Sequence, residues 1–144
     1  MSNASYWRLL IVSGCLLLAG MIQHVVAQEP QLIVEIAKRE IYEGESVLYR
    51  VTLNHVEVPT APTLAGLEDF QVTNLGEQSQ NSQQVTIING RRTEIVRRGM
   101  QYNYRLTPKQ SGLFTIPAPT AKVGNDVLTG REITLRVVAP EIQD

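Results

Sequence analysis

Few side chains of this 144-residue sequence could carry out catalysis, which needs a titrating group, a nucleophile or a metal. His55 is the one histidine beyond the first 27 residues, and the only cysteine, Cys15, lies within them. No Gly-x-Ser-x-Gly turn accompanies His55 to suggest a Ser–His–Asp set, so we interpret it as a polar residue at a strand end. We expect the protein not to be an enzyme; a hydrolase that uses His55 is the alternative.

Three glutamates, Glu40, Glu43 and Glu45, gather around one turn. A calcium loop would place Asp or Asn at alternate positions with a distal Glu, and zinc would require several Cys, His or carboxylate ligands. The spacing of three and two residues favours a solvated turn. We therefore expect neither a metal site nor a cofactor.

Five arginines are the most informative polar residues: Arg91, Arg92, Arg97, Arg98 and Arg105. They lie on or near one expected hairpin, where guanidinium groups can bind a partner protein's carboxylates through paired hydrogen bonds. The alternative is that the charges prevent an edge strand from pairing with a neighbour. Tyr102 and Tyr104 follow the hairpin, a combination also found on nucleic-acid surfaces, but we expect no nucleic acid as partner of an exported protein.

The amino terminus has the features of a secretory signal peptide over residues 1–27. Arg8 precedes the apolar run Leu9–Ile22, and Val25 and Ala27 occupy the positions that signal peptidase requires. We expect cleavage after Ala27 and export to the periplasm or cell envelope. The alternatives are an uncleaved membrane anchor and a lipoprotein processed at Cys15, within the box Val12–Cys15.

The mature chain is long enough for one domain, which we place at residues 28–140, with 141–144 as a polar tail. It would contain no cysteine, so packing rather than disulfides must stabilise it. The formal net charge of the whole sequence is −1, which gives no general attraction to nucleic acid or to an anionic membrane.

Apolar residues alternate with polar ones through most of residues 31–138, a period typical of half-buried strands. Strands are indicated within 31–38, 46–54, 70–76, 83–96, 100–108, 113–117, 120–123 and 132–140. Prolines in 55–70 indicate an extended crossover in which Leu64 and Leu67 point inward. The fold class predicted is all-β: an immunoglobulin-like antiparallel β-sandwich of about seven to eight strands, preceded by a signal peptide.

Asn89, Gly90, Gly112 and Pro117 mark the sharpest turns. Asn89-Gly90 stands between two β-rich segments and predicts a two-residue type I′ turn. Gly112 permits the turn before a short strand with Phe114 and Ile116 on its core face. Pro117 and Pro119 then end ladder pairing, as proline does at a sheet edge.

The segment 102–130 resembles the repeated domain of the BatD family, the "oxygen tolerance" proteins of bacterial envelopes. The matching positions are Tyr102, Tyr104, Leu106, Pro108, Gly112, Phe114, Ile116 and Pro117. The segments 34–53, 64–72 and 88–92 resemble the family's other strands and hairpin, so the likeness covers 32–138. It implies partners among membrane proteins with von Willebrand A domains, and a Bat/MoxR-type stress or aerotolerance system. Family members are usually longer and membrane-anchored, so we expect a single-domain relative or a truncated product.

These observations favour a non-enzymatic, exported protein-binding or scaffold module of the bacterial cell envelope. Contact with a membrane is expected only through partners or an uncleaved anchor. The alternative is a sandwich that binds carbohydrate or peptidoglycan, for which the candidate aromatic residues are Tyr42, Tyr49, Tyr102 and Tyr104.

Overall fold

The computed structural model describes residues 28–141, which form eleven strands and no helix. Residues 1–27 and 142–144 lie outside the described part, and with them the predicted cleavage site at Ala27. The strands are β1 (Gln31–Ile36), β2 (Glu40–Tyr42), β3 (Val47–Asn54), β4 (Phe70–Ser79), β5 (Ser82–Ile88), β6 (Arg91–Arg97), β7 (Gly99–Pro108), β8 (Gly112–Ile116), β9 (Thr120–Val123), β10 (Asp126–Thr129) and β11 (Ile133–Val138).

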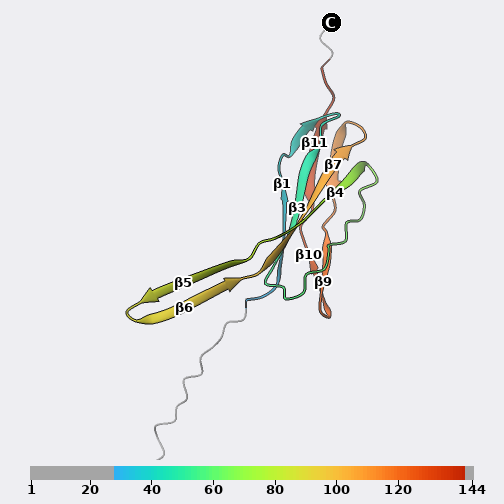
Figure 1. The fold of residues 1–144 in the computed structure, drawn as a ribbon. Coiled ribbons are helices and arrows are strands. Elements are labelled where there is room, and N and C mark those ends of the chain that lie inside the picture. Colours follow the sequence, from blue (N-terminus) through green and yellow to red (C-terminus); the bar gives the residue numbers. More distant parts are fainter. Residues whose placement is uncertain (1–27, 142–144) are drawn as a thin grey trace, which may run out of the picture.

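Two sheets form the body of the molecule (Figure 1). The larger has the strand order β1-β3-β7-β4 and is antiparallel throughout. The smaller has the order β2-β11-β8, with β2 parallel to β11. The β9–β10 hairpin extends the body and is joined to the crossover by a bridge between Thr63 and Thr120.

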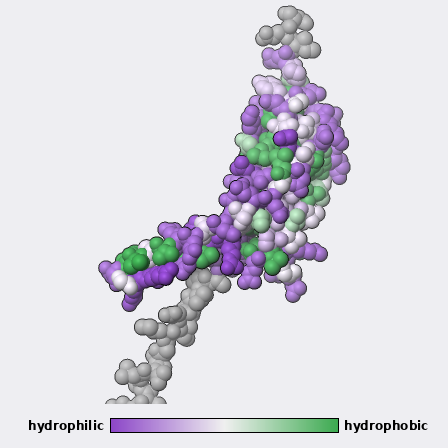
Figure 2. Space-filling view, in the orientation of Figure 1, coloured by the Kyte–Doolittle hydropathy of each residue, from purple (hydrophilic) through white to green (hydrophobic). Residues whose placement is uncertain are grey.

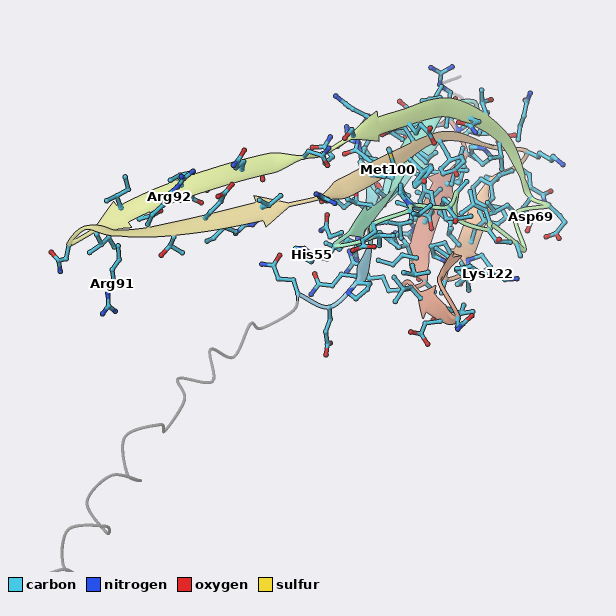
Figure 3. All side chains as sticks on the ribbon, turned by 60° about the horizontal axis from the view of Figure 1, so that its bottom comes forward. His55, Asp69, Arg91, Arg92, Met100 and Lys122 are labelled. Carbon is cyan, nitrogen blue, oxygen red and sulfur yellow. The ribbon has the colours of Figure 1, made fainter. Side chains whose placement is uncertain are left out.

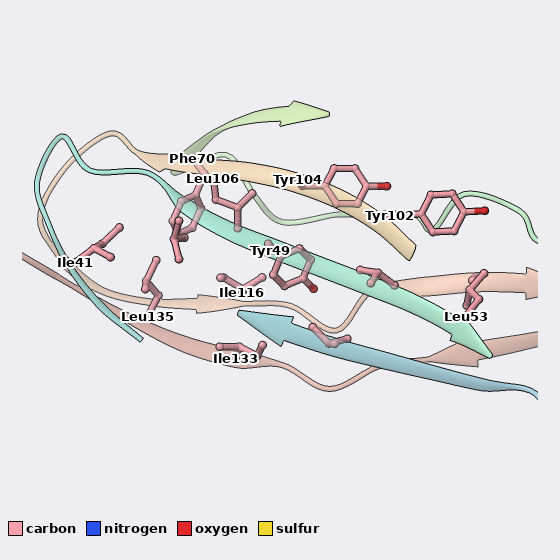
Figure 4. Close-up of a cluster of buried hydrophobic side chains, with 14 of the residues drawn as sticks. Ile41, Tyr49, Leu53, Phe70, Tyr102, Tyr104, Leu106, Ile116, Ile133 and Leu135 are labelled. Atoms are coloured by element: carbon pink, nitrogen blue, oxygen red, sulfur yellow. The ribbon is translucent and has the colours of Figure 1, made fainter. Parts of the chain in front are cut away.

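The core lies between the two sheets because each strand places alternate side chains inward. In β3, Val47, Tyr49, Val51 and Leu53 are buried, as the apolar alternation predicts. The smaller sheet contributes the buried side chains of Ile41, Ile116, Ile133, Leu135 and Val137, which face those of the larger sheet (Figure 4). Leu64 and Leu67 of the crossover pack against this cluster, as predicted.

The predicted all-β sandwich is thereby confirmed, with eleven strands rather than seven to eight. Two short strands account for most of the difference. β2 has three residues and lies in a segment that was interpreted as a turn; it is a strand because it pairs with the distant β11. β10 follows the Gly124 turn and pairs with β9. Both strands are too short to show a clear period of two, and the distant partner of β2 leaves no signal in the local sequence.

The segment from Gly112 to Pro119, which contains β8, has the predicted turn and strand. Gly112 adopts φ 141, a conformation that favours glycine, and β8 ends at Ile116 directly before Pro117. Ile116 is buried, and Phe114 contacts the ring of Phe70 edge to face at a centroid distance of 5.5 Å. β8 is an edge strand of its sheet, bounded by a proline.

Candidate partner-binding hairpin

A two-stranded hairpin projects from the sandwich (Figures 1 and 3). It continues β4 into β5 and returns through β6 into β7, and we call its residues 82–98 the arm. β5 pairs with β6 over seven residue pairs, and the two form a sheet of their own. At about 3.3 Å per residue, such strands extend about 23 Å.

The tip of the arm is the predicted type I′ turn. Asn89 and Gly90 have φ values of 51 and 75, and Ile88 pairs directly with Arg91 across the two-residue loop. Both central residues of this turn need positive φ, which Asn tolerates and Gly adopts freely. The sequence signal and the structure agree here because the turn depends on local backbone preference alone.

Backbone hydrogen bonds fix the arm where it leaves the body. The N–H of His55 donates to the carbonyl of Arg98 at 2.7 Å, and the N–H of Gln80 donates to the carbonyl of Gly99 at 2.8 Å. His55 has φ 58 and comes directly after β3, at a strand end as predicted. The orientation of the arm is therefore tied to the ends of β3 and β4.

The structure brings together four of the five predicted arginines. Arg91 and Arg92 lie beside the tip (Figure 3). Arg97 ends β6 and Arg98 follows it, so both are at the base of the arm. Arg105 is elsewhere: it belongs to β7 in the body, where it pairs with Leu48 and Thr73. Arg105 is seven positions beyond Arg98 along an extended chain, so it lies outside the arm, and its role in partner binding stays a prediction.

Exposed apolar side chains accompany these arginines, and the sequence interpretation did not single them out. Val85, Ile87, Ile88 and Val96 are 44%, 69%, 65% and 47% exposed, and apolar and polar surface mix along the arm in Figure 2. Alternating apolar residues normally indicate a buried face. Here the hairpin extends beyond the second sheet, so no layer of the body covers these side chains.

Polar contacts within the arm are exposed and weak. Arg92 Nη2 lies 3.7 Å from Glu94 Oε2, and Gln83 Nε2 donates to the other oxygen of the same carboxylate. Exposed ion pairs of this kind contribute about 0–1 kcal/mol. The guanidinium groups of the arm are consequently available to carboxylates of a partner.

The residues considered for catalysis or metal binding, His55 and the glutamates Glu40, Glu43 and Glu45, do not come together in one site. His55 borders a hollow of about 270 Å³ with Val56, Glu57, Val96 and Arg98. Within residues 28–141 no three His, Cys, Asp or Glu side chains are placed to hold a metal ion. Glu40 instead lies 3.7 Å from Arg136, and the Glu45 carboxylate accepts a hydrogen bond from the N–H of Tyr42.

Three of the four tyrosines considered for sugar binding are core residues. Tyr49, Tyr102 and Tyr104 are 1%, 5% and 7% exposed, whereas Tyr42 is 60% exposed. Burial raises the pKa of Tyr49 to about 12, with the neighbouring Tyr104 adding to the effect. Burial likewise raises the pKa of Tyr102 and of Tyr104, and the Glu77 carboxylate contributes to both. A stacking platform of several tyrosines is therefore not present on the described surface.

Comparison with known proteins adds the family. Residues 34–137 match the family described as BatD DUF11 like domain. No curated protein and no solved structure is similar enough to this chain to count as a match. No helix in residues 28–141 is long and apolar enough to cross a membrane. The family match extends from β1 to β11 and includes the arm, so this chain belongs to the BatD family.

Proposed function

We propose that this chain is a non-enzymatic, exported protein-binding module of the bacterial cell envelope that engages its partner through the arm. The observation that supports this most is the arm itself. It combines four arginines with four exposed apolar side chains on a hairpin that contributes nothing to the core. Aliphatic surface beside guanidinium groups is suited to a protein surface with apolar and acidic groups.

The family suggests the kind of partner. BatD proteins are expected to act beside membrane proteins with von Willebrand A domains and a MoxR-type ATPase, in a stress or aerotolerance system. The exposed edges of β5 and β6 also provide unpaired backbone groups for strand addition. The arm thus offers both backbone and side-chain contacts.

Affinity capture tests the proposal. Tagged residues 28–144, which contain the whole described core, would be recovered from crosslinked envelopes beside a variant with Arg91, Arg92, Arg97 and Arg98 all changed to Glu. The matched control reverses four exposed cations of the body instead: Lys38, Arg39, Arg105 and Lys122. We expect envelope proteins with the unaltered chain and the control, and at least tenfold less with the arm variant. Equal recovery by all three would place the binding surface elsewhere.

A further inference from the structure

We infer that the arm of one molecule docks against the opposite end of a second copy, so that the chain associates head to tail. This inference rests on the binding function proposed above and names a second copy of the chain as one partner of the same surface. Three observations carry it: the chemistry of the arm tip, a hollow at the far end of the sandwich, and the separation of charge between them.

The tip combines apolar and cationic groups at its most projecting point. Ile87 and Ile88 are 69% and 65% exposed, and in the ladder they stand opposite Arg92 and Arg91. Isolated two-stranded hairpins are at best marginally stable in water, so large apolar side chains at such a tip favour a complementary surface. That surface has to offer an apolar recess with acidic groups around it.

A hollow with these properties lies on the smaller sheet, at the end of the body away from the arm. It measures about 550 Å³, is lined by Leu113, Val137 and Val138, and has Glu40 and Arg136 beside them. Leu113 is 71% exposed. Tyr42, 60% exposed, pairs with Val138 in the ladder and extends the apolar area. We call this the end hollow.

Acidic residues gather around the end hollow. The N–H of Glu43 donates to the carbonyl of Val138 at 2.9 Å, and Glu141 follows Val138 by three residues. Glu40 and Glu45 add two further carboxylates, while Arg136 offsets one of them by its contact with Glu40 at 3.7 Å. Arg39 is a second cation nearby, since its carbonyl accepts a hydrogen bond from the N–H of Arg136 at 2.8 Å. Four carboxylates against two guanidinium groups leave the rim with a formal charge of −2.

Over residues 28–141, positive charge is concentrated in the arm and negative charge in the rest of the chain. The arm contains four arginines and one glutamate, a formal charge of +3. The rest of residues 28–141 contains eight basic and twelve acidic residues, a formal charge of −4. A second copy satisfies the arm and the end hollow together, whereas an anionic lipid surface would satisfy the arm alone.

The two surfaces belong to opposite ends of the sandwich. The arm leaves the body at one end of β3, where Asn54 pairs with Gly99 (Figure 1). The end hollow lies beyond the other end of β3, beside the pair of Val138 and Tyr42. A contact between two different surfaces of the same molecule leaves one arm and one hollow free at the ends of each pair. It therefore propagates into open chains, or into rings if the rotation closes.

Sedimentation velocity and light scattering of purified residues 28–144, with the tag removed, test the inference. We expect the average mass to rise with protein concentration at low salt and to fall toward the monomer at high salt, because the contact is partly ionic. The Arg91→Glu, Arg92→Glu variant should associate at least about tenfold more weakly. The matched control Arg105→Glu, Lys122→Glu, which changes charge equally within the body, should associate like the unaltered protein.

A charge exchange between variants makes the test specific. Glu43→Lys, Glu141→Lys reverses the rim of the end hollow and should weaken association to a similar extent. Mixing this variant with the Arg91→Glu, Arg92→Glu variant restores opposite charges at both kinds of contact, so the mixture should associate more strongly than either component alone. Leu113→Ser should weaken association, whereas Val127→Ser, which removes a 59% exposed valine from β10, should not.

Several outcomes would overturn the inference. A protein that stays monomeric at every concentration and salt would do so, as would a charge-exchange mixture that remains monomeric. So would a monomer that binds anionic vesicles through Ile87 and Ile88. None of these results decides whether the arm captures other envelope proteins, so failure of the inference and failure of the proposed function are distinguishable.

Discussion

Gly66 and Pro117 approach so closely that a Cβ at Gly66 would lie 2.8 Å from Cγ of Pro117. Gly66 also adopts φ 70, a conformation that L side chains rarely take. The contact joins the crossover between β3 and β4 to the residue that follows β8, and thereby connects the two sheets outside the strand ladders. Pro117 thus ends the pairing of β8 and also packs against the crossover at Gly66.

Replacing Gly66 with Ala should destabilise the body through both effects. We expect a loss of about 2–4 kcal/mol, from overpacking against the proline ring and from the strained φ. Chemical denaturation of residues 28–144 measures it. Gly44→Ala is the matched control, because Gly44 has φ 90 and open space around its Cβ position. That control should lose only about 1–2 kcal/mol, and equal losses for both variants would show that the proline contact contributes nothing.

The arm should be dispensable for folding of the sandwich. No core side chain comes from β5 or β6, and the N–H of Gln80 already donates to the carbonyl of Gly99 at the base. Replacing residues 81–98 with Asn-Gly should join β4 to β7 through a tight turn. We expect thermal unfolding to remain cooperative, with a change in stability of about 1 kcal/mol or less. A variant that fails to fold would contradict the independence of arm and body.

The arm itself should depend on its turn. Gly90→Ala places a side chain at φ 75 in a type I′ turn and should destabilise the hairpin by about 1–2 kcal/mol. Hydrogen exchange should accelerate at the amides of β5 and β6 while those of β3 and β11 keep their protection, because the arm opens separately from the core. Equal acceleration in both regions would show that arm and sandwich unfold as one unit.

Much of the body could be predicted from the sequence because its strands carry their own alternation. Tyr49 and Val51 in β3, and Leu135 in β11, are buried where a period of two places them. The Asn89-Gly90 turn followed equally from local backbone preference. β2 was not predicted, because three residues are too few to show a period of two. Its partner β11 is also nearly a hundred residues away in the sequence, so no local signal indicates the pairing.

The candidate site was only partly predictable. The arginines of the arm were identified from their clustering, but the apolar half of the surface, including Ile87 and Val96, was not. Alternation tells which residues share a face, yet it does not tell whether a second layer covers that face. The same limitation explains Arg105, whose separation from the arm depends on where β7 enters the body.

Tyr49 should make the sandwich sensitive to alkali. Its hydroxyl is buried and has no hydrogen-bond partner among the described residues, and burial raises its pKa to about 12 from an unfolded value of about 10. The unfolded chain loses this proton at lower pH than the folded one, so the contribution to stability is complete below pH 10 and is lost as pH rises through 12.

Tyr49→Phe removes the titrating group and the unsatisfied donor together. We expect it to unfold at higher denaturant concentration than the unaltered protein between these pH values, and to be as stable or about 1 kcal/mol more stable at neutral pH. Tyr42→Phe, at an exposed tyrosine, controls for loss of a phenol, and a Tyr49→Phe variant with an unchanged alkaline transition would assign that transition to other groups.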